Sequence, residues 1–497
     1  ILSLPPPPGV LINCGSTKPI EVGPVRYIPD EGLIATGNTT ALKTPNLLPL
    51  LSTLRYFPDE KARKYCYVLQ SVKGGRYLIR TSYWYGGFDG GKTPPVFDQI
   101  IGGTKWGTVN TTEDFAKGLS SYYELVVAAT GKTMSVCLAR NAETLGSPFI
   151  SGIEMISLGD SLYNTTDFTR FALASVARHS FGHEDDEIVS YPDDPFNRYW
   201  QPFKDENPIV QSKSAVSSFD FWNLPPATVF GHALTTSRGK SLTVKWPAFS
   251  LPSGDYFISL YFQDPRTSSP YSWRNFDVKV NGQNFYTNLN ATAAGVTVYS
   301  ANWPLAGSTE ILMTPAKDSP VGPVINAGEI YQLIPLSGRT QTRDVIAMED
   351  LARSFSNPPP DWKGDACLPL SHGWTGVTCD TQKKLARVTK IDLTGMGISG
   401  SLPERLVNLT ALTHLWLGGN KLTGNIPELS QMPSLQTLHL ESNNLEGPIP
   451  NSLGDLLNLQ ELSLQNNNLT GDIPKSLKNK SNLTIQVSPG NSLLHKG

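Results

Sequence analysis

The chain of 497 residues is long enough for two to four domains. Its 41 Lys and Arg residues nearly balance 43 Asp and Glu residues, so no basic excess points to nucleic acid or an anionic membrane. The 43 Gly and 39 Pro residues, with 9% aromatic residues, favour a β-rich protein with many turns. No run reaches the roughly 18 apolar residues that a membrane helix requires. Because the chain opens at Ile1 rather than Met, we expect that a signal peptide was removed or not included.

The first 336 residues contain a degenerate internal repeat. Gly75-Arg-Tyr-Leu-Ile-Arg-Thr-Ser-Tyr83 matches Gly254-Asp-Tyr-Phe-Ile-Ser-Leu-Tyr-Phe262, and a second matching block lies downstream at the same offset of 179 residues. Each block reads as a glycine turn, an alternating strand, a loop and a second strand. We therefore expect a mainly β protein that begins with two tandem modules, β-sandwiches or jelly rolls, at residues 1–165 and 166–336.

An aromatic run in the first module is the best candidate for a ligand site. Aromatic rings cover the apolar faces of sugars, and a carboxylate accepts hydrogen bonds from sugar hydroxyls. The alternative is that the rings belong to the core, since alternate residues of a strand point to opposite faces and only the last two positions of the run are expected on a loop. The candidate ligand residues are Tyr83, Trp84, Tyr85, Phe88 and Asp89.

Three cysteines lie in the predicted modules, at Cys14, Cys66 and Cys137. They allow three pairings, each of which leaves one thiol over. Cys66 and Cys137 both lie in strand-like runs, so this pairing is favoured while the other two stay open.

Two motifs that resemble ligand sites are set aside. Thr130-Gly-Lys-Thr133 lacks the upstream glycine of a phosphate loop, because Val126 stands there, and it is interpreted as a hairpin turn. His179 and His183 have the spacing of metal ligands on a helix, but the glycine and acidic residues that follow indicate a surface loop. We therefore expect neither a metal nor a cofactor.

Paired carboxylates at residues 185–186 and 193–194 are the remaining hint of catalysis. A glycosidase needs two such groups across its substrate. These lie in a turn-rich connection, however, and no nucleophile motif accompanies them. We therefore predict that this chain is not an enzyme, with a secreted wall enzyme as the least favoured hypothesis.

Residues 337–387 are predicted to link the modules to the C-terminal repeats and to cap those repeats. Val345, Met348 and Leu351 have helical spacing behind a Thr/Asp cap. Farther on, Cys367 and Cys379 lie close together just before the repeats, which indicates a disulfide that staples an exposed edge. A zinc site is the alternative, but no second Cys or His pair lies nearby to complete four ligands.

The C-terminal region, residues 388–497, has the strongest pattern in the chain. Segments that start at residues 388, 412, 435 and 459 follow the pattern L-x-x-L-x-L-x-x-N-x-L, but the first departs from it, with Met396 in the place of the Asn. Each L-x-L is expected to form a short strand whose leucines point into a solenoid core. The Asn residues that end each strand are expected to bond the backbone of the neighbouring coil; they are Asn420, Asn443 and Asn467.

Residues that flank the inward leucines must point outward. Trp416 and His439 then lie one strand apart on the outer face, about 4.8 Å along the stacking direction. An exposed Trp is typical of a protein interface, although the two modules folding back on the solenoid would also cover it. The candidate partner-binding residues are His414, Trp416, His439 and Glu441.

The repeats and their cap resemble plant leucine-rich-repeat receptors. The cap motif W-x-G-D-P-C…W-x-G-V-x-C is matched by residues 362–367 and 374–379, with Ala366 in the place of the usual Pro. Residues in the two modules resemble the malectin-like tandem of plant receptor-like kinases; they include Ile12-Asn-Cys-Gly15, Arg274-Asn-Phe-Asp277 and Gly328-Glu-Ile-Tyr331. This resemblance spans nearly the whole chain.

Eight Asn-x-Ser/Thr sequons favour secretion and N-glycosylation. They are Asn38, Asn110, Asn164, Asn290, Asn408, Asn468, Asn479 and Asn482.

The resemblance implies the ligand-recognition region of a plant cell-surface receptor-like protein or kinase, at the extracellular face of the plasma membrane. Its expected partners are a protein or peptide ligand, or an oligosaccharide, together with a co-receptor ectodomain, and no nucleic acid. The alternative function is a carbohydrate-binding protein for cell-wall glucans. In the family, a membrane helix and often a kinase follow such a region; neither occurs within these residues.

Overall fold

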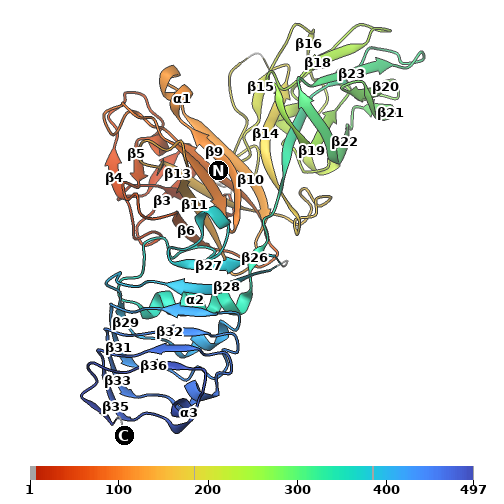
Figure 1. The fold of residues 1–497 in the computed structure, drawn as a ribbon. Helices are drawn as coiled ribbons and strands as arrows, with labels where there is room; N and C mark the ends of the chain where they lie inside the picture. Colours follow the sequence, from red (N-terminus) through yellow and green to blue (C-terminus); the bar gives the residue numbers. More distant parts are fainter. Residues whose placement is uncertain (1–6, 184, 383–384, 496–497) are drawn as a thin grey trace.

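The computed structural model describes residues 7–183, 185–382 and 385–495. Two β-rich modules lie at one end of the molecule, and a solenoid extends from the first of them (Figure 1). We call strands β1 to β13 the first module, strands β14 to β25 the second module, and the part from β26 onward the solenoid with its cap. This mainly β architecture confirms the fold class predicted from the sequence. Within the described residues, no helix is long and apolar enough to cross a membrane.

A large sheet passes from the first module into the second. In spatial order its strands are β2 (Ile20–Val22), β3 (Val25–Pro29), β1 (Gly9–Asn13), β13 (Gly152–Leu158), β7 (Arg76–Tyr83), β10 (Ser121–Ala128), β14 (Phe171–Phe181), β25 (Ala327–Pro335), β19 (Leu251–Phe262) and β22 (Val296–Gly307), with β15 (Gln201–Phe203) beside β14. The modules meet at the antiparallel pair β10–β14, where Leu125 faces Ala174 and Val126 faces Leu173. The two modules therefore share a hydrogen-bonded sheet, a continuity that the internal repeat did not reveal.

Smaller sheets cover the shared sheet in each module. In the first module they are β6 (Tyr65–Gln70), β11 (Thr133–Arg140), β8 (Val96–Ile101) and β9 (Thr104–Asn110), and separately β12 (Phe149–Ile150), β5 (Thr53–Tyr56) and β4 (Asn38–Ala41). In the second module they are β18 (Leu242–Lys245), β23 (Glu310–Pro315), β20 (Trp273–Val280) and β21 (Gln283–Thr292), and separately β16 (Ile209–Gln211), β17 (His232–Thr235) and β24 (Val324–Ile325). Ile79 and Leu125 of the shared sheet pack in one core with Phe97 and Val136 of the facing sheet, as in a β-sandwich.

A row of buried charges of alternating sign crosses the shared sheet. It runs through five neighbouring strands, from β13 to β25, and consists of Glu154, Arg80, Glu124, Arg178 and Glu329. Successive members lie 2.5 to 3.0 Å apart, and each is at most 4% exposed. The Coulombic attraction of these charges offsets the cost of removing them from water only while every charge keeps its partner. The row therefore ties the first module to the second through Glu124 and Arg178.

Helices are short, apart from the predicted cap helix. They are α1 (Thr112–Lys117), α2 (Thr342–Ser354) and α3 (Lys475–Lys478), with 3₁₀ turns η1 (Pro49–Leu51), η2 (Ser218–Asp220), η3 (Ala227–Phe230), η4 (Leu370–His372), η5 (Glu404–Asn408) and η6 (Asn451–Asp455). The expected Thr/Asp cap of α2 is wrong: Thr342 is the first helical residue, and Gln341 at the N-cap makes no side-chain bond. The Asp344 carboxylate accepts hydrogen bonds from Arg387 and the Val388 amide instead, which fixes α2 to the first repeat.

The solenoid stacks two parallel sheets. One contains β26 (Arg339–Thr340), β28 (Leu385–Asp392), β30 (His414–Trp416), β32 (Thr437–His439), β34 (Glu461–Ser463) and β36 (Thr484–Gln486), with β27 (Val377–Asp380) beside β28. The other contains β29 (Ser399–Gly400), β31 (Lys421–Asn425), β33 (Asn444–Pro448), β35 (Asn468–Asp472) and β37 (Leu493–His495). The leucines of each L-x-L segment are buried in a core that also includes the cap helix.

Asparagines link successive coils as predicted. Asn443 donates to the Leu417 and Leu440 carbonyls at 3.0 and 3.1 Å and accepts from the Leu422 amide at 3.0 Å. Asn491 makes the corresponding bonds two coils later, to the Leu464 carbonyl and from the Leu469 amide. The coil that contains Asn491 therefore continues the solenoid, although it lacks the repeat pattern in the sequence.

The cap holds the solenoid against the first module. Lys64, which is fully buried, donates to the carbonyls of Asp365 and Leu368, the former at 2.5 Å. Burial lowers the pKa of Lys64 to about 8, although Asp365 and Asp361 act in the opposite direction. His372 Nε2 adds a contact to the Arg140 carbonyl at 2.9 Å. The orientation of the solenoid is therefore set by contacts with the first module.

Candidate ligand and partner sites

Side chains on the outer face of the first solenoid sheet touch one another from strand to strand. Lys390 Nζ lies 3.7 Å from the centre of the Trp416 indole ring. The Trp416 and His439 rings stack with centroids 5.4 Å apart and planes at 10°. His439 Nε2 in turn lies 3.4 Å from a carboxylate oxygen of Glu461. We call these four residues the solenoid ladder. They come from β28, β30, β32 and β34, and they include two of the predicted partner-binding residues, Trp416 and His439.

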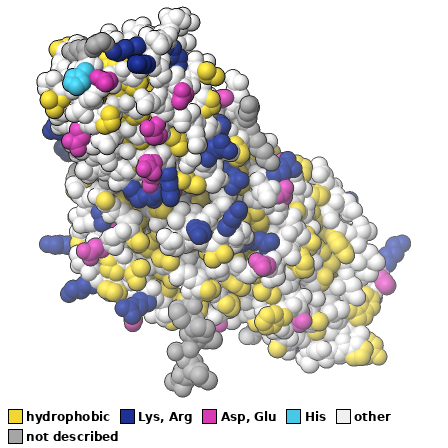
Figure 2. Space-filling model, turned by 90° about the horizontal axis from the view of Figure 1, so that it is seen from below, with side chains coloured by type: hydrophobic (Ala, Val, Ile, Leu, Met, Phe, Trp, Pro, Cys, Tyr) yellow, Lys and Arg dark blue, Asp and Glu magenta, His cyan; other side chains and the backbone are white. Residues whose placement is uncertain are grey.

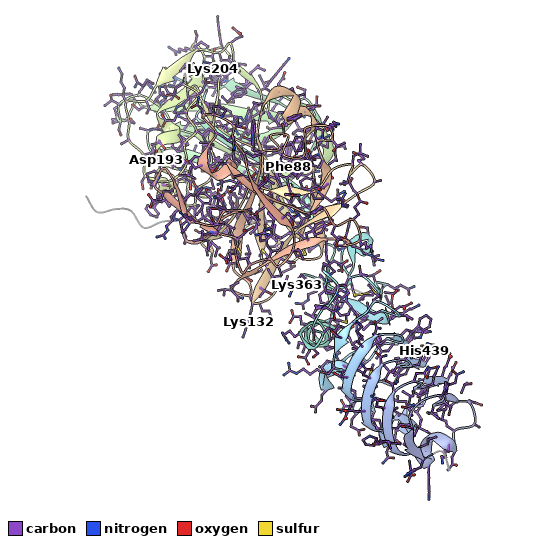
Figure 3. All side chains as sticks on the ribbon, turned by 90° about the vertical axis from the view of Figure 1, so that its left-hand side faces the viewer. Phe88, Lys132, Asp193, Lys204, Lys363 and His439 are labelled. Carbon is purple, nitrogen blue, oxygen red and sulfur yellow. A yellow bond between two sulfur atoms is a disulfide. The ribbon has the colours of Figure 1, made fainter. Side chains whose placement is uncertain are left out.

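The Trp416 ring is half-buried but fixed in position. Its Nε1 donates to Thr437 Oγ1 at 2.6 Å, and the His414 ring meets it edge-on at 5.6 Å. These contacts all come from the solenoid itself, and His439 lies on the solenoid well away from both modules (Figure 3). A ring held in this way loses little conformational entropy when a partner covers it.

Burial and neighbouring groups set the protonation states of His414 and Asp392, which lie beside the ladder. Burial, and then the nearby Lys390 and His439, lower the pKa of His414, so its imidazole is neutral at pH 7. Burial alone would raise the pKa of Asp392, but hydrogen bonds from Thr394 and Lys390 outweigh it and lower the pKa. An ionised Asp392 lies 3.4 Å from Lys390 Nζ and anchors that end of the ladder.

Glu441, the fourth predicted partner residue, follows His439 by two residues in the same coil. Its carboxylate occupies the space over Gly418, where an added Cβ would lie 2.1 Å from Oε1. Glu441 Oε2 and Gln465 Oε1 are buried acceptors without a hydrogen-bond partner among the described residues. Such acceptors favour a partner surface that donates hydrogen bonds. Binding by the four predicted residues stays a prediction.

The aromatic run in the first module divides between core and loop. Tyr83 is 1% exposed and donates to Gln99, so it belongs to the core. Tyr85 is also buried, whereas its hydroxyl donates to the exposed Asp89 carboxylate. Burial, then the bond to Asp89, raise the pKa of Tyr85. Trp84 is half-buried, with its Nε1 unpaired among the described residues.

Phe88 is the centre of a cluster that the sequence did not predict. The half-buried Phe88 ring lies 5.0 Å from Tyr56 and 5.5 Å from Tyr85. Phe115, 38% exposed, approaches Tyr85 at 4.8 Å. Tyr56 and Phe115 come from distant segments, so no local pattern could have shown this proximity. Sugar binding by the five candidate residues stays a prediction.

The disulfides pair as the sequence favoured. Cys66 joins Cys137 across β6 and β11, and Cys367 joins Cys379 in the cap. Cys14 is a buried free thiol, and burial raises its pKa well above the usual value, so it stays protonated. Gly364 of the cap packs on the first disulfide, since an added Cβ would lie 3.2 Å from the Cys66 sulfur. The first disulfide therefore forms part of the surface that receives the cap.

The histidines that the sequence did not favour as metal ligands, and one of the paired carboxylates, pack against other parts of the second module. Asp194 is buried and pairs with Arg198 at 2.8 Å. His179 lies in β14 and not on a helix, and the ring of His183 lies 4.7 Å from that of His232. In the part of the chain that the structure describes, no group of three or more His, Cys, Asp or Glu side chains could hold a metal ion.

Residues 130–133 connect two different sheets, so the interpretation as a hairpin turn is wrong. The preceding strand β10 belongs to the shared sheet, whereas the following strand β11 pairs with β6 and β8. The turn therefore carries the chain from one layer of the sandwich to the other.

The sequons lie on the surface. Asn408 is half-buried, and the other seven side chains are exposed: Asn38, Asn110, Asn164, Asn290, Asn468, Asn479 and Asn482. The face seen from the solenoid end carries interspersed Lys, Arg, Asp and Glu side chains (Figure 2). Attachment of glycans at these positions stays a prediction.

Comparison with known proteins identifies both parts of the chain. The family model of the malectin-like domain matches residues 12–333, and leucine-rich-repeat models match residues 410–454 and 458–480. A probable LRR receptor-like serine/threonine-protein kinase of Arabidopsis thaliana is 32% identical over 456 residues, covering 86% of this chain and 47% of the relative. A second one from the same plant is 29% identical over 402 residues, covering 79% and 44%. The chain spans just under half the length of these relatives.

Solved structures share the fold of the two modules. The ANXUR1 extracellular domain from Arabidopsis thaliana has a TM-score of 0.53 at 17% identity, covering 65% of this chain and 96% of that one. A chain in the complex of the plant peptide RALF23 with FER and LLG2 has a TM-score of 0.52 at 18% identity, covering 65% and 94%. Together with the match over residues 12–333, these findings show that the chain belongs to the malectin-like domain family, with leucine-rich repeats after that domain.

Proposed function

We propose that this chain is the extracellular ligand-recognition region of a plant cell-surface receptor-like protein or receptor-like kinase. It recognises a protein or peptide ligand, or a cell-wall carbohydrate, and assembles with a co-receptor ectodomain through the solenoid ladder. The relatives named as receptor-like kinases support a receptor role. The neighbouring structure that contains a peptide and a further protein supports assembly with such partners. We assign no reaction to this chain.

The single observation that carries this proposal is the ladder of Lys390, Trp416, His439 and Glu461. An indole ring held between a cation and an imidazole on the outer face of the solenoid has the features of an interface hot spot. The solenoid is short, and a stable complex buries about 1,600 Å². We therefore expect a composite site in which the modules also contact the partner.

Substitution Trp416→Ala tests this proposal. Truncation of a central aromatic residue is expected to weaken association with a plant co-receptor ectodomain by about 30-fold, as for a loss of roughly 2 kcal/mol. Secretion and melting temperature should stay near wild type, because the ring lies outside the leucine core. Surface plasmon resonance with a panel of co-receptor ectodomains provides the measurement.

The matched control is Trp222→Ala in the second module. Trp222 is 39% exposed and also stacks on a neighbouring ring, that of Tyr299. If Trp416→Ala associates as wild type does, or if it destabilises the free protein, the ladder is not the partner site.

Carbohydrate binding without a receptor role is the second candidate function. The observation in its favour is the cluster of Phe88, Tyr56 and Phe115 beside the exposed Asp89 carboxylate. The Asp89 carboxylate already accepts the Tyr85 hydroxyl, which reduces its capacity for sugar hydroxyls. This candidate therefore ranks below the receptor role.

A further inference from the structure

Two exposed aromatic rings lie together on the second module. Trp222, just after η2, is 39% exposed, and Tyr299 of β22 is 40% exposed. Their rings are parallel within 3°, with centroids 5.8 Å apart. β22 is the last strand of the shared sheet, at the opposite end from β2 (Figure 1). We call Trp222 and Tyr299 the aromatic pair.

The aromatic pair is fixed in place by its neighbours. The Trp222 amide donates to Thr297 Oγ1 at 3.2 Å. The Tyr299 ring stacks on the buried Phe257 ring, with centroids 6.3 Å apart and planes at 16°. Rings held in this way lose little conformational entropy when a ligand covers them. Adjoining exposed rings therefore favour an interaction surface at this point of the module.

A glycosylation sequon lies beside the aromatic pair. Asn164 is exposed and belongs to the connection between β13 and β14. The Thr166 amide donates to the Tyr163 carbonyl at 3.1 Å, so Asn164 lies on a tight turn. The Tyr163 amide in turn donates to the side-chain oxygen of Asn223 at 2.7 Å. Asn164 and Trp222 are thus each one residue away from a hydrogen-bonded pair, and consecutive Cα atoms are only about 3.8 Å apart.

A buried arginine joins the turn to the segment that carries the indole. Arg198 is 0% exposed and donates to the Tyr163 hydroxyl at 3.2 Å and to the Asn223 carbonyl at 2.7 Å. Ring contacts give a second connection, because the Tyr163 ring meets Phe257 at 5.8 Å and Tyr299 stacks on Phe257. The sequon and the aromatic pair are therefore parts of one fixed surface.

We propose that the first sugars of an N-glycan attached at Asn164 pack on the aromatic pair. N-acetylglucosamine presents apolar C–H faces, which aromatic rings cover. Attachment makes the contact intramolecular, and an effective concentration in the millimolar range populates an interaction that is too weak to retain a free sugar. The glycan also leaves little room for a protein partner on this surface. The inference goes beyond the proposed receptor role and requires only that the chain is secreted.

A double-mutant cycle on protein secreted from plant cells tests the inference. Mass spectrometry of glycopeptides should show that Asn164 carries a glycan. Asn164→Gln should lower the melting temperature of the modules by about 3 °C in the wild-type background. In the Trp222→Ala background it should have almost no effect, because the contact is already lost.

The matched control is the same substitution at another sequon, Asn468→Gln. Asn468 is exposed and lies in β35, in a solenoid sheet that contains no Phe, Tyr or Trp. Its effect on the melting temperature should be the same in the wild-type and Trp222→Ala backgrounds, since the two sites share no contact.

Nuclear magnetic resonance gives a readout that does not depend on stability. Protons above an aromatic ring are shifted upfield. The N-acetyl methyl signals of a ¹³C-labelled glycan at Asn164 should therefore lie upfield in the wild-type protein and return to the position of a free glycan in Trp222→Ala.

Three results would overturn the inference: an unglycosylated Asn164, an equal effect of Asn164→Gln in both backgrounds, or wild-type glycan signals at the free position. Loss of co-receptor association in Trp222→Ala would also overturn it and assign the aromatic pair to a protein partner. If Trp416→Ala keeps its co-receptor while the cycle shows coupling, the ladder proposal fails and this inference stands.

Discussion

The solenoid and the junction between the two modules are both built on buried strands, but their interiors differ. Leu415, Leu438 and Leu462 of the solenoid are each 0% exposed and repeat the same contact in every coil. The junction instead buries the charge row, in which each member depends on neighbours from other strands. A truncated leucine leaves a cavity within its own coil, whereas the loss of one buried charge leaves its neighbours on both sides without a partner. We therefore expect the junction to respond more strongly to a single substitution.

Arg178→Met provides the strongest test of this difference. It leaves Glu124 and Glu329 without their shared cation, and breaking a buried ion pair costs about 3–5 kcal/mol. Differential scanning calorimetry should show a lower transition temperature for the modules, while the solenoid transition remains. Lys117→Ala serves as the control, because Lys117 and Glu113 form an exposed pair. An unchanged transition in Arg178→Met would show that the row contributes little to stability.

Removal of the Cys367–Cys379 disulfide tests the solenoid end of the comparison. Chain-entropy estimates give about 3 kcal/mol for a loop of this length. The double substitution Cys367→Ser/Cys379→Ser should therefore expose the first coil and sharply reduce secretion. Yield and melting temperature measured against wild type decide the point. If neither changes, the bond is not required for the cap to fold.

The two regions also differ in how much of them the sequence predicted. The solenoid could be predicted because the L-x-L strands recur at a nearly constant period. Strands that follow one another in the sequence are therefore also neighbours in space. The coil around Asn491 escaped because Pro489 and Gly490 interrupt the leucine pattern, although its Asn makes the same bonds. The candidate partner residues could be predicted to share a face because they flank the inward leucines, which recur with the same period.

The charge row could not be predicted in this way. Each member has at least one apolar neighbour in its own strand, as Arg80 has in Ile79. That signal was available, but the alternation of sign appears only in the spatial order of β13, β7, β10, β14 and β25. These strands are distant in the sequence, so the row has no local signature.

Asn443→Ala should have a smaller effect, which sharpens the comparison within the solenoid. The substitution removes donors to the Leu417 and Leu440 carbonyls and the acceptor for the Leu422 amide. Because the freed backbone groups are buried, we expect a loss of about 2 kcal/mol. Urea unfolding of the variant gives the value. Asn444→Ala, at the exposed neighbouring position, should unfold as wild type does; equal losses would mean that the asparagine bonds add nothing specific.

Phe88→Ala should have the smallest effect on folding, about 1 kcal/mol, because the ring is half-buried and mainly contacts other rings. The same variant tests whether the first module binds carbohydrate. If the cluster binds glycan, Phe88→Ala and Asp89→Ala should each reduce the heat of binding of glucose oligosaccharides in titration calorimetry, since stacking and a hydroxyl acceptor are lost. The exposed Leu145, which is 79% exposed, supplies the control Leu145→Ala. Absence of heat for the wild-type chain at millimolar oligosaccharide would exclude this site and leave peptide or protein recognition as the function of the molecule.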